Sequence, residues 1–220
     1  MKISLPKLAA LALLVGCTSA QSQTLNWRSV IGTEIVNSSG QEIDSEGVGL
    51  ENTFLFQLGV FEEDFIPDET NMGQWLANWH VFDSAMLGNN GDGTSQFSST
   101  AVVPPEPVNA SDPPNPDREE YLSMFEGLKG YIWIRNQAGT EFFLASASTW
   151  TFPTAEECCP TNTFGWSMSE VVVPVWGSND SGTPGDYYIQ THAVPEAGST
   201  LLGLIACGMT VLRRRRTVLG

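Results

Sequence analysis

Histidine and serine chemistry is poorly supported by this sequence. The 220-residue chain has two histidines, His80 and His192, so a serine–histidine–aspartate system would have to use one of them. A Gly-x-Ser-x-Gly motif, which supplies the nucleophile of many hydrolases, is absent from the sequence. His192 lies in the segment that leads to the C-terminal end, and we expect His80 to be exposed or partly packed. We therefore predict no nucleophilic hydrolase.

Carboxylates are the other groups that could carry acid–base chemistry. Glu62, Glu63 and Asp64 follow an apolar segment, and Glu119 and Glu120 follow a proline-rich stretch. A glycosidase needs two carboxylates about 5–10 Å apart across a cleft. In a chain this rich in acidic residues, some pair will meet that distance by chance. A glycosidase is therefore the least favoured function, and we predict no catalytic residue.

A metal site is indicated only weakly. Residues 89–94 read Asn-Asn-Gly-Asp-Gly-Thr, similar to the centre of a calcium-binding loop, but Gly88 and Ser99 occupy the positions of the first and last ligands. The adjacent cysteines Cys158 and Cys159 have no histidine nearby that would complete a zinc site. We predict no bound metal and no cofactor, although so acidic a surface favours weak binding of divalent cations.

The charge balance excludes one class of partner. Residues 21–190 contain 24 acidic and 4 basic residues, a formal net charge of −20. Nucleic-acid binding needs a basic surface that neutralises phosphates, so this region is not expected to bind DNA or RNA. Such a charge favours solubility in an ionic exterior. It would also repel anionic membranes and acidic polysaccharides unless divalent cations bridged the two.

The tryptophans favour an alternative function in carbohydrate binding. Seven tryptophans are many for this length, and sugar-binding modules stack pyranose rings on exposed aromatic side chains. Most tryptophans are core residues, so this reading competes with simple packing. The candidates for a sugar platform, which lie on or near expected strands, are Trp133, Trp150, Trp166 and Trp176.

Short apolar segments separated by Gly, Pro and Asn turns predict a mainly β domain over residues 21–190. We expect an antiparallel β-sandwich with one packed amphipathic helix. A turn at residues 137–140 should join two of the strands in a hairpin. The expected strands are residues 27–36, 54–61, 131–135, 142–146, 150–152 and 171–176.

One helix and one long loop complete the expected domain. Residues 72–86 place Trp75, Trp79, Phe82 and Met86 at steps of four, three and four, which is the spacing of one helical face. We predict that this helix lies against a sheet. Residues 101–117 contain two proline clusters, and we expect an extended surface loop there.

The first 20 residues are typical of a secretory signal peptide. Lys2 and Lys7 form a basic start, residues 8–16 are apolar, and small residues lead to cleavage after Ala20. An alternative is a bacterial lipobox that ends at Cys17, in which case this cysteine would be lipidated. Either reading predicts that the domain is exported.

The C-terminal segment, residues 191–220, has the three-part order of a sorting tail. It begins with the short motif Val194, Pro195 and Glu196. Residues 197–212 are uncharged and, as a helix, would span about 24 Å, slightly less than a hydrocarbon core of about 30 Å. The basic residues that would stay in the cytoplasm and fix the orientation are Arg213, Arg214, Arg215 and Arg216.

This tail resembles the PEP-CTERM sorting domain of exported bacterial proteins. The resemblance implies recognition, and cleavage near Pro195 and Glu196, by an exosortase, a membrane-embedded processing enzyme. It also implies a place at the cell surface, or release into an exopolysaccharide or biofilm matrix. Because such a tail is an address carried by unrelated proteins, it does not assign an activity to residues 21–190. We therefore expect a non-catalytic surface or matrix protein, with a carbohydrate-binding module of the matrix as the alternative.

Overall fold

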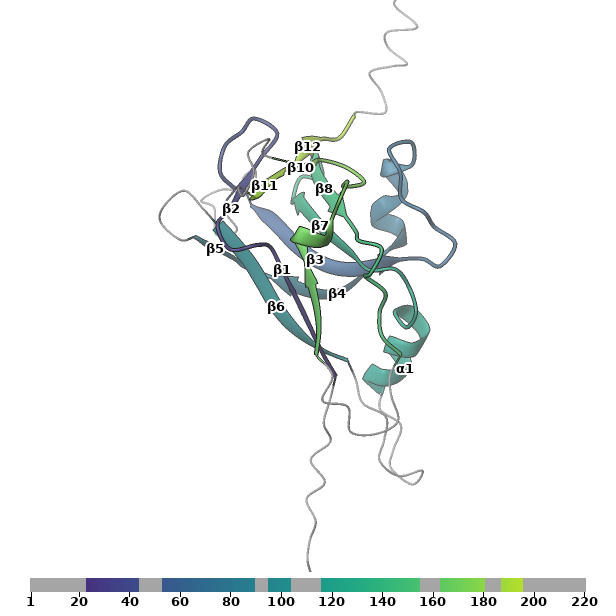
Figure 1. Ribbon diagram of the computed structural model, residues 1–220. Helices are drawn as coiled ribbons and strands as arrows, with labels where there is room; N and C mark the ends of the chain where they lie inside the picture. The colour runs from purple at the N-terminus through teal and green to yellow at the C-terminus, as the bar shows by residue number, and fades with distance from the viewer. Residues whose placement is uncertain are drawn as a thin grey trace, which may run out of the picture.

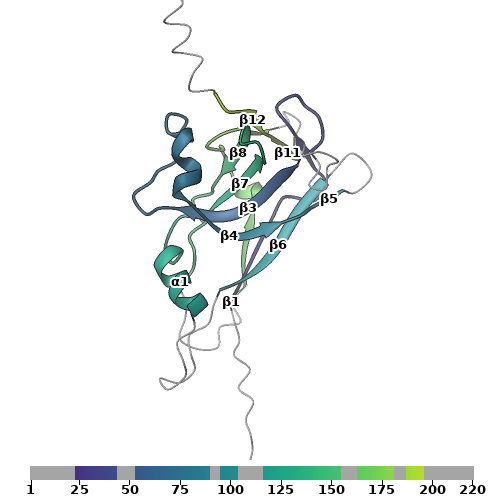
Figure 2. The same cartoon turned by 180° about the vertical axis from the view of Figure 1, so that it is seen from behind.

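The computed structural model describes residues 23–43, 53–89, 95–103, 116–154, 163–180 and 187–195 (Figures 1 and 2). The expected signal peptide with Ala20 and Cys17, the pair Cys158 and Cys159, and the tail from Glu196 onward lie outside these ranges. Most of the expected calcium-like turn and most of the proline-rich loop also lie outside them. Residues 101–103 belong to a strand and residues 116 and 117 to a helix, so the prediction of a loop is wrong at these two ends.

The described residues form two facing β-sheets, so the prediction of a mainly β domain is confirmed. The larger sheet has the order β10-β11-β2-β6-β1-β9, with β5 also paired to β6, and the smaller has the order β12-β8-β7-β3-β4. The larger sheet consists of β1 (Gln23–Arg28), β2 (Thr33–Val36), β5 (Leu87–Asn89), β6 (Ser95–Val103), β9 (Thr163–Ser167), β10 (Ser178–Asp180) and β11 (Tyr187–Gln190). The smaller consists of β3 (Phe54–Phe61), β4 (Trp79–Ala85), β7 (Tyr131–Asn136), β8 (Glu141–Ala145) and β12 (His192–Ala193).

The larger sheet is mixed rather than antiparallel, which corrects the prediction. Strand β1 pairs in parallel with β9, and β2 pairs in parallel with β11. These partners are joined by long stretches of chain and not by hairpins. The alternation of apolar and polar residues shows which face of a strand is buried but says nothing about the direction of its neighbour.

The expected first strand, residues 27–36, is two strands. A turn between β1 and β2 places Gly32 at a φ of +81°, a backbone conformation that glycine adopts without strain. Both strands still pair with β6, β1 with its C-terminal part and β2 at Ser95. The break therefore divides the expected strand in two, and both parts remain in the larger sheet.

The smaller sheet is apolar on both faces. Its inner face packs against the larger sheet in the main core through residues such as Phe56, Ile132 and Phe143. Its outer face carries a second cluster that includes Phe61, Trp133 and Leu144. Because both faces are covered, β3, β7 and β8 read as nearly continuous apolar runs, and all three were predicted correctly, as was the hairpin turn at residues 137–140.

The predicted helix over residues 72–86 is wrong beyond its first half. Residues Met72–Asn78 form the 3₁₀ helix η2, and the chain then continues as strand β4. The η2 helix lies over the outer face of the smaller sheet (Figure 1). Its Trp75 is fully buried and stacks on Phe142, with ring centroids 5.9 Å apart. A helix packed on a sheet is therefore present, but it is shorter and of another kind.

Strand β4 contains a β-bulge, and its residues Trp79 and Phe82 face opposite sides of the smaller sheet. The register between β3 and β4 shifts at Leu58 and Gly59, which pair with Asp83 and Val81 and leave Phe82 as the extra residue. Before the bulge Trp79 faces the outer cluster, and Phe82 packs against the main core. The aromatic residues at steps of four and three thus serve two different layers.

Two other expected strands are absent from the described residues. Within residues 150–152 only Thr151 makes an isolated bridge, to Lys129. Residues 171–176 follow the 3₁₀ helix η3 (Met168–Glu170), and Val172 and Val173 are 88% and 74% exposed. These valines made the segment resemble a buried strand, but they project into solvent.

One α-helix, α1 (Pro116–Met124), was not predicted. It lies at the end of the molecule opposite β12 (Figures 1 and 2). Around its C-terminal end, Tyr121 and Phe125 form an aromatic cluster with Phe82 and Phe152. We did not predict this helix because the sequence before it is rich in proline. Proline is nevertheless well suited to the first turn of a helix, where α1 has Pro116.

Candidate functional site

The predicted sorting motif begins where the last described strand, β12, ends. Strand β12 pairs with β8 in the register His192 to Phe142 and Ala193 to Glu141. The next residue, Val194, donates its N–H to the carbonyl oxygen of Thr140 at 2.7 Å. Pro195 is exposed, and Glu196 lies outside the described residues. Two of the three predicted motif residues are therefore placed, one held at the sheet edge and one directed to solvent.

Side chains reinforce this edge. The Thr191 hydroxyl donates to the Glu141 carboxylate at 2.9 Å, and Thr191 is fully buried. The indole N–H of Trp176 donates to the carbonyl oxygen of His192 at 3.2 Å. The Trp176 and His192 rings also meet edge to face, with centroids 5.8 Å apart. The segment that precedes the motif is thus anchored by main chain and side chains together.

Three of the four predicted sugar-platform tryptophans are buried, so that prediction is wrong for them. Trp133 and Trp150 are fully buried and Trp166 is 4% exposed. Trp150 and Trp166 stack on one another at 5.7 Å, and the Arg135 guanidinium lies 5.4 Å from the Trp133 ring. A pyranose ring cannot reach these faces, because neighbouring side chains already cover them.

Trp176 is the partly exposed member of the four. It sits between the second apolar cluster and His192, where it holds the start of the tail. Its indole N–H is already used in the bond to His192. The structure therefore gives Trp176 a structural partner and does not bring the four tryptophans to one surface.

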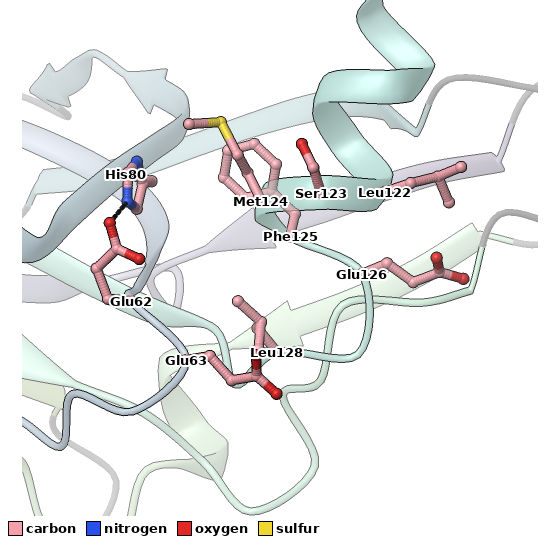
Figure 3. Close-up of a pocket in the computed structure, with 9 residues that line it drawn as sticks. All are labelled: Glu62, Glu63, His80, Leu122, Ser123, Met124, Phe125, Glu126 and Leu128. Carbon is pink, nitrogen blue, oxygen red and sulfur yellow. Dashed lines mark hydrogen bonds and ion pairs between the residues drawn. The ribbon is translucent and has the colours of Figure 1, made fainter.

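A pocket of about 390 Å³ lies between α1 and the end of β3 (Figure 3). It is mixed in character, with acidic and apolar side chains and one histidine. Its lining consists of Glu62, Glu63, His80, Leu122, Ser123, Met124, Phe125, Glu126 and Leu128. Sequence reasoning named Glu62, Glu63 and His80 separately but did not predict that they share a pocket. That arrangement depends on the pairing of β3 with β4 and on α1, and neither was predicted.

His80 and Glu62 form the most ordered polar pair of this pocket. Their Nε2 and Oε1 atoms lie 2.8 Å apart, and the two side chains are 26% and 58% exposed. Figure 3 shows them facing one another at one side, while the Glu126 carboxylate extends away from them. The predicted partial packing of His80 is confirmed, although it lies on a strand and not on a helix.

The pocket does not assemble a nucleophile with its base. The Ser123 hydroxyl donates to the Glu120 carbonyl oxygen at 3.0 Å, and His80 contacts Glu62 instead. Glu120, which we had considered as a catalytic carboxylate, is exposed and does not line the pocket. Among the described residues, no group of three or more His, Cys, Asp or Glu side chains is arranged to hold a metal ion.

The titratable groups with shifted pKa values lie away from this pocket or at its aromatic border. Burial, followed by the charge of Glu126, raises the pKa of Tyr121, whose hydroxyl donates to the Pro153 carbonyl oxygen at 2.5 Å. Burial lowers the pKa of Arg135 and raises that of Tyr131. These shifts reflect packing in the aromatic clusters.

The expected membrane span falls in the part of the chain that is not described. Among the residues that are described, every helix is too short or too polar to cross a bilayer. Comparisons with protein-family models, with curated proteins and with solved structures found no match to this chain.

Proposed function

We propose that this chain is an exported, non-catalytic protein of the cell surface or extracellular matrix. In this proposal residues 1–20 direct export and residues 197–212 anchor the chain in the membrane. An exosortase-type enzyme recognises Val194, Pro195 and Glu196. Processing near Pro195 then keeps the acidic β-rich domain at the surface or releases it to the matrix.

The observation that carries the proposal is the position of the motif. The β-rich fold extends to Val194, whose N–H donates the last described hydrogen bond along the chain. Pro195, the next residue, is exposed. An address that is read by an enzyme must lie outside the packed domain. Pro195 meets that requirement, whereas Val194 is still held by the fold.

The burial of the aromatic side chains supports a role for them in packing rather than in binding a substrate. Trp75, Trp133 and Phe61 fill the second apolar cluster, so their rings are used in packing. A formal charge of −20 over residues 21–190 favours solubility and mutual repulsion outside the cell.

The test is a substitution of the motif in the native host. In the variant Pro195→Ala with Glu196→Ala, we expect the full-length chain to accumulate in the membrane. The control, Thr217→Ala with Val218→Ala, leaves the motif, the apolar run and the arginines intact and should be processed normally. Intact mass of the mature protein gives the cleavage site. Normal processing of the motif variant would contradict the proposal.

A further inference from the structure

We propose that residues 191–194 form a latch that must leave the sheet before the tail can be cut. This inference rests on the proposed function of the tail. It concerns the domain side of the cleavage site, which the motif itself does not describe. In this view the fold of the domain controls how fast its own anchor is removed.

The latch is defined by main-chain contacts at the edge of the smaller sheet. Thr191 donates its N–H to the carbonyl oxygen of Val36 at 3.1 Å, and Val194 donates to that of Thr140 at 2.7 Å. Between them, β12 pairs with β8. The segment therefore contacts both sheets within four residues.

Side chains determine how tightly the latch is closed. Thr191 bonds the carboxylate of Glu141, and Glu141 also accepts the N–H of Ser38 at 3.1 Å. Trp176 donates to the main chain of His192 and packs against its ring. Glu141, Ser38 and Trp176 belong to the body of the domain, so they stay in place when residues 191–194 detach.

Cleavage and latching compete for the same peptide groups. Proteins that bind an extended peptide do so largely through its main-chain N–H and C=O groups. At about 3.3 Å per residue, the peptide bond between Pro195 and Glu196 lies within roughly 7 Å of the last anchored residue. An enzyme that needs several extended residues before that bond would need groups that the sheet already occupies.

Opening the latch does not require the domain to unfold. Strand β12 has two residues and lies at the sheet edge. Of the latch side chains, Val194 packs, partly buried, against the second apolar cluster, whose buried members lie outside residues 191–194. Edge segments with few contacts open locally at less cost than the whole fold. When opening is fast compared with cutting, the rate of cutting follows the open fraction.

The experiment compares processing rates of full-length variants in the native host by pulse labelling. Thr191→Val removes the bond to Glu141, and Trp176→Phe removes the bond to His192. Loss of one such bond should raise the open fraction and the processing rate by about 2- to 10-fold. The control Ile132→Val weakens the core in β7, away from the latch, and should leave the rate unchanged.

A spacer gives an independent test. Inserting Gly-Ser-Gly-Ser between Ala193 and Val194 keeps the motif intact and moves it away from the sheet. We expect this chain to be processed faster than wild type, and adding Thr191→Val should then give no further increase. Hydrogen exchange of the full chain in detergent should show a protected Val194 amide in wild type and a less protected one in Thr191→Val.

Three results would overturn the latch. These are processing of Thr191→Val at or below the wild-type rate, a spacer variant no faster than wild type, and an unprotected Val194 amide. The proposed function fails separately, when Pro195→Ala with Glu196→Ala is processed like wild type. If the chain is cut at the motif and the latch variants do not change the processing rate, the proposed function stands and the latch proposal is wrong.

Discussion

The indole N–H of Trp27 donates a 2.7 Å hydrogen bond to the carboxylate of Asp83. Trp27 lies on β1 of the larger sheet and is fully buried, and Asp83 lies on β4 of the smaller sheet. The bond therefore joins the two sheets. It also satisfies the one polar atom of a side chain that otherwise packs against Phe97.

Removing the acceptor of this bond should destabilise the domain. Asp83→Ala leaves a buried indole N–H without its partner, which costs about 1–3 kcal/mol. Asp83→Asn keeps an oxygen in place and should cost less. Urea unfolding followed by circular dichroism measures both. Equal losses for the two variants would show that the negative charge of Asp83 is what stabilises the fold, since a neutral oxygen would then give no benefit over its absence. A smaller loss for Asp83→Asn supports the hydrogen bond itself.

A methyl group at Gly59 should be among the most damaging small changes. A Cβ there would lie 2.0 Å from the carbonyl oxygen of His80, which is main chain and cannot move away without breaking the β3–β4 pairing. Overpacking of this kind costs at least about 1–3 kcal/mol, so Gly59→Ala should lower the unfolding midpoint clearly. The matched control is Gly73→Ala in η2, where a Cβ meets nothing within 4 Å. A Gly59→Ala protein as stable as Gly73→Ala would contradict the bulge geometry.

Acid should weaken the η3 region through Glu170. Burial, the largest single influence, raises the pKa of Glu170, but bonds from the Thr149 hydroxyl at 2.6 Å and the Ser167 N–H at 2.9 Å bring it below its ordinary 4.5. A carboxylate whose folded pKa is depressed contributes stability above the unfolded value, and this contribution is lost as pH falls through the folded pKa.

The corresponding measurement is unfolding of wild type and Glu170→Gln as a function of pH. Wild type should be the more stable protein at neutral pH, and the difference should shrink as pH falls below 4.5. Thr149→Val removes one of the donors and should give a smaller pH dependence than wild type. Parallel curves for wild type and Glu170→Gln would show that these bonds do not stabilise the ionised form.

The His80–Glu62 pair should contribute little to stability. Both side chains are partly exposed, and exposed ion pairs are worth about 0–1 kcal/mol. A double-mutant cycle with His80→Gln and Glu62→Gln should therefore give a coupling energy within that range, falling further in high salt. A much larger, salt-insensitive coupling would mean that the pocket is less hydrated than its geometry indicates.

The sequence predicted strands best where both faces of a strand are buried. Residues 54–61 are apolar almost throughout, and β3 has these bounds. Prediction failed at Trp79 and Phe82, because one residue of η2 and residues from both faces of β4 together have the spacing of one helical face. It failed again at Val172 and Val173, where apolar composition did not mean burial.

The site was predictable as a motif but not as a surface. The order of Val194, Pro195 and Glu196 can be read directly from the chain, whereas the bond from Val194 to Thr140 requires the β7–β8 hairpin to be in place. The tryptophans show that composition alone can suggest a binding site that the fold does not form. Their number suggested a ligand, but only the two-layer arrangement around the smaller sheet shows that Trp133 is already enclosed.

The parallel pairing of β2 with β11 has a consequence for the timing of folding. Thr33, near the start of the described chain, pairs with Tyr187, near its end, so the larger sheet cannot close until almost the whole domain is available. Contacts this distant in sequence slow folding, because the loop between them must be ordered first. If the chain is exported from its N-terminus as proposed, β2 can pair with β6 early, but its other edge stays open until β11 arrives. The moment of closure would then coincide with the arrival of residues 191–195, so completion of the fold and presentation of the proposed anchor would be one event.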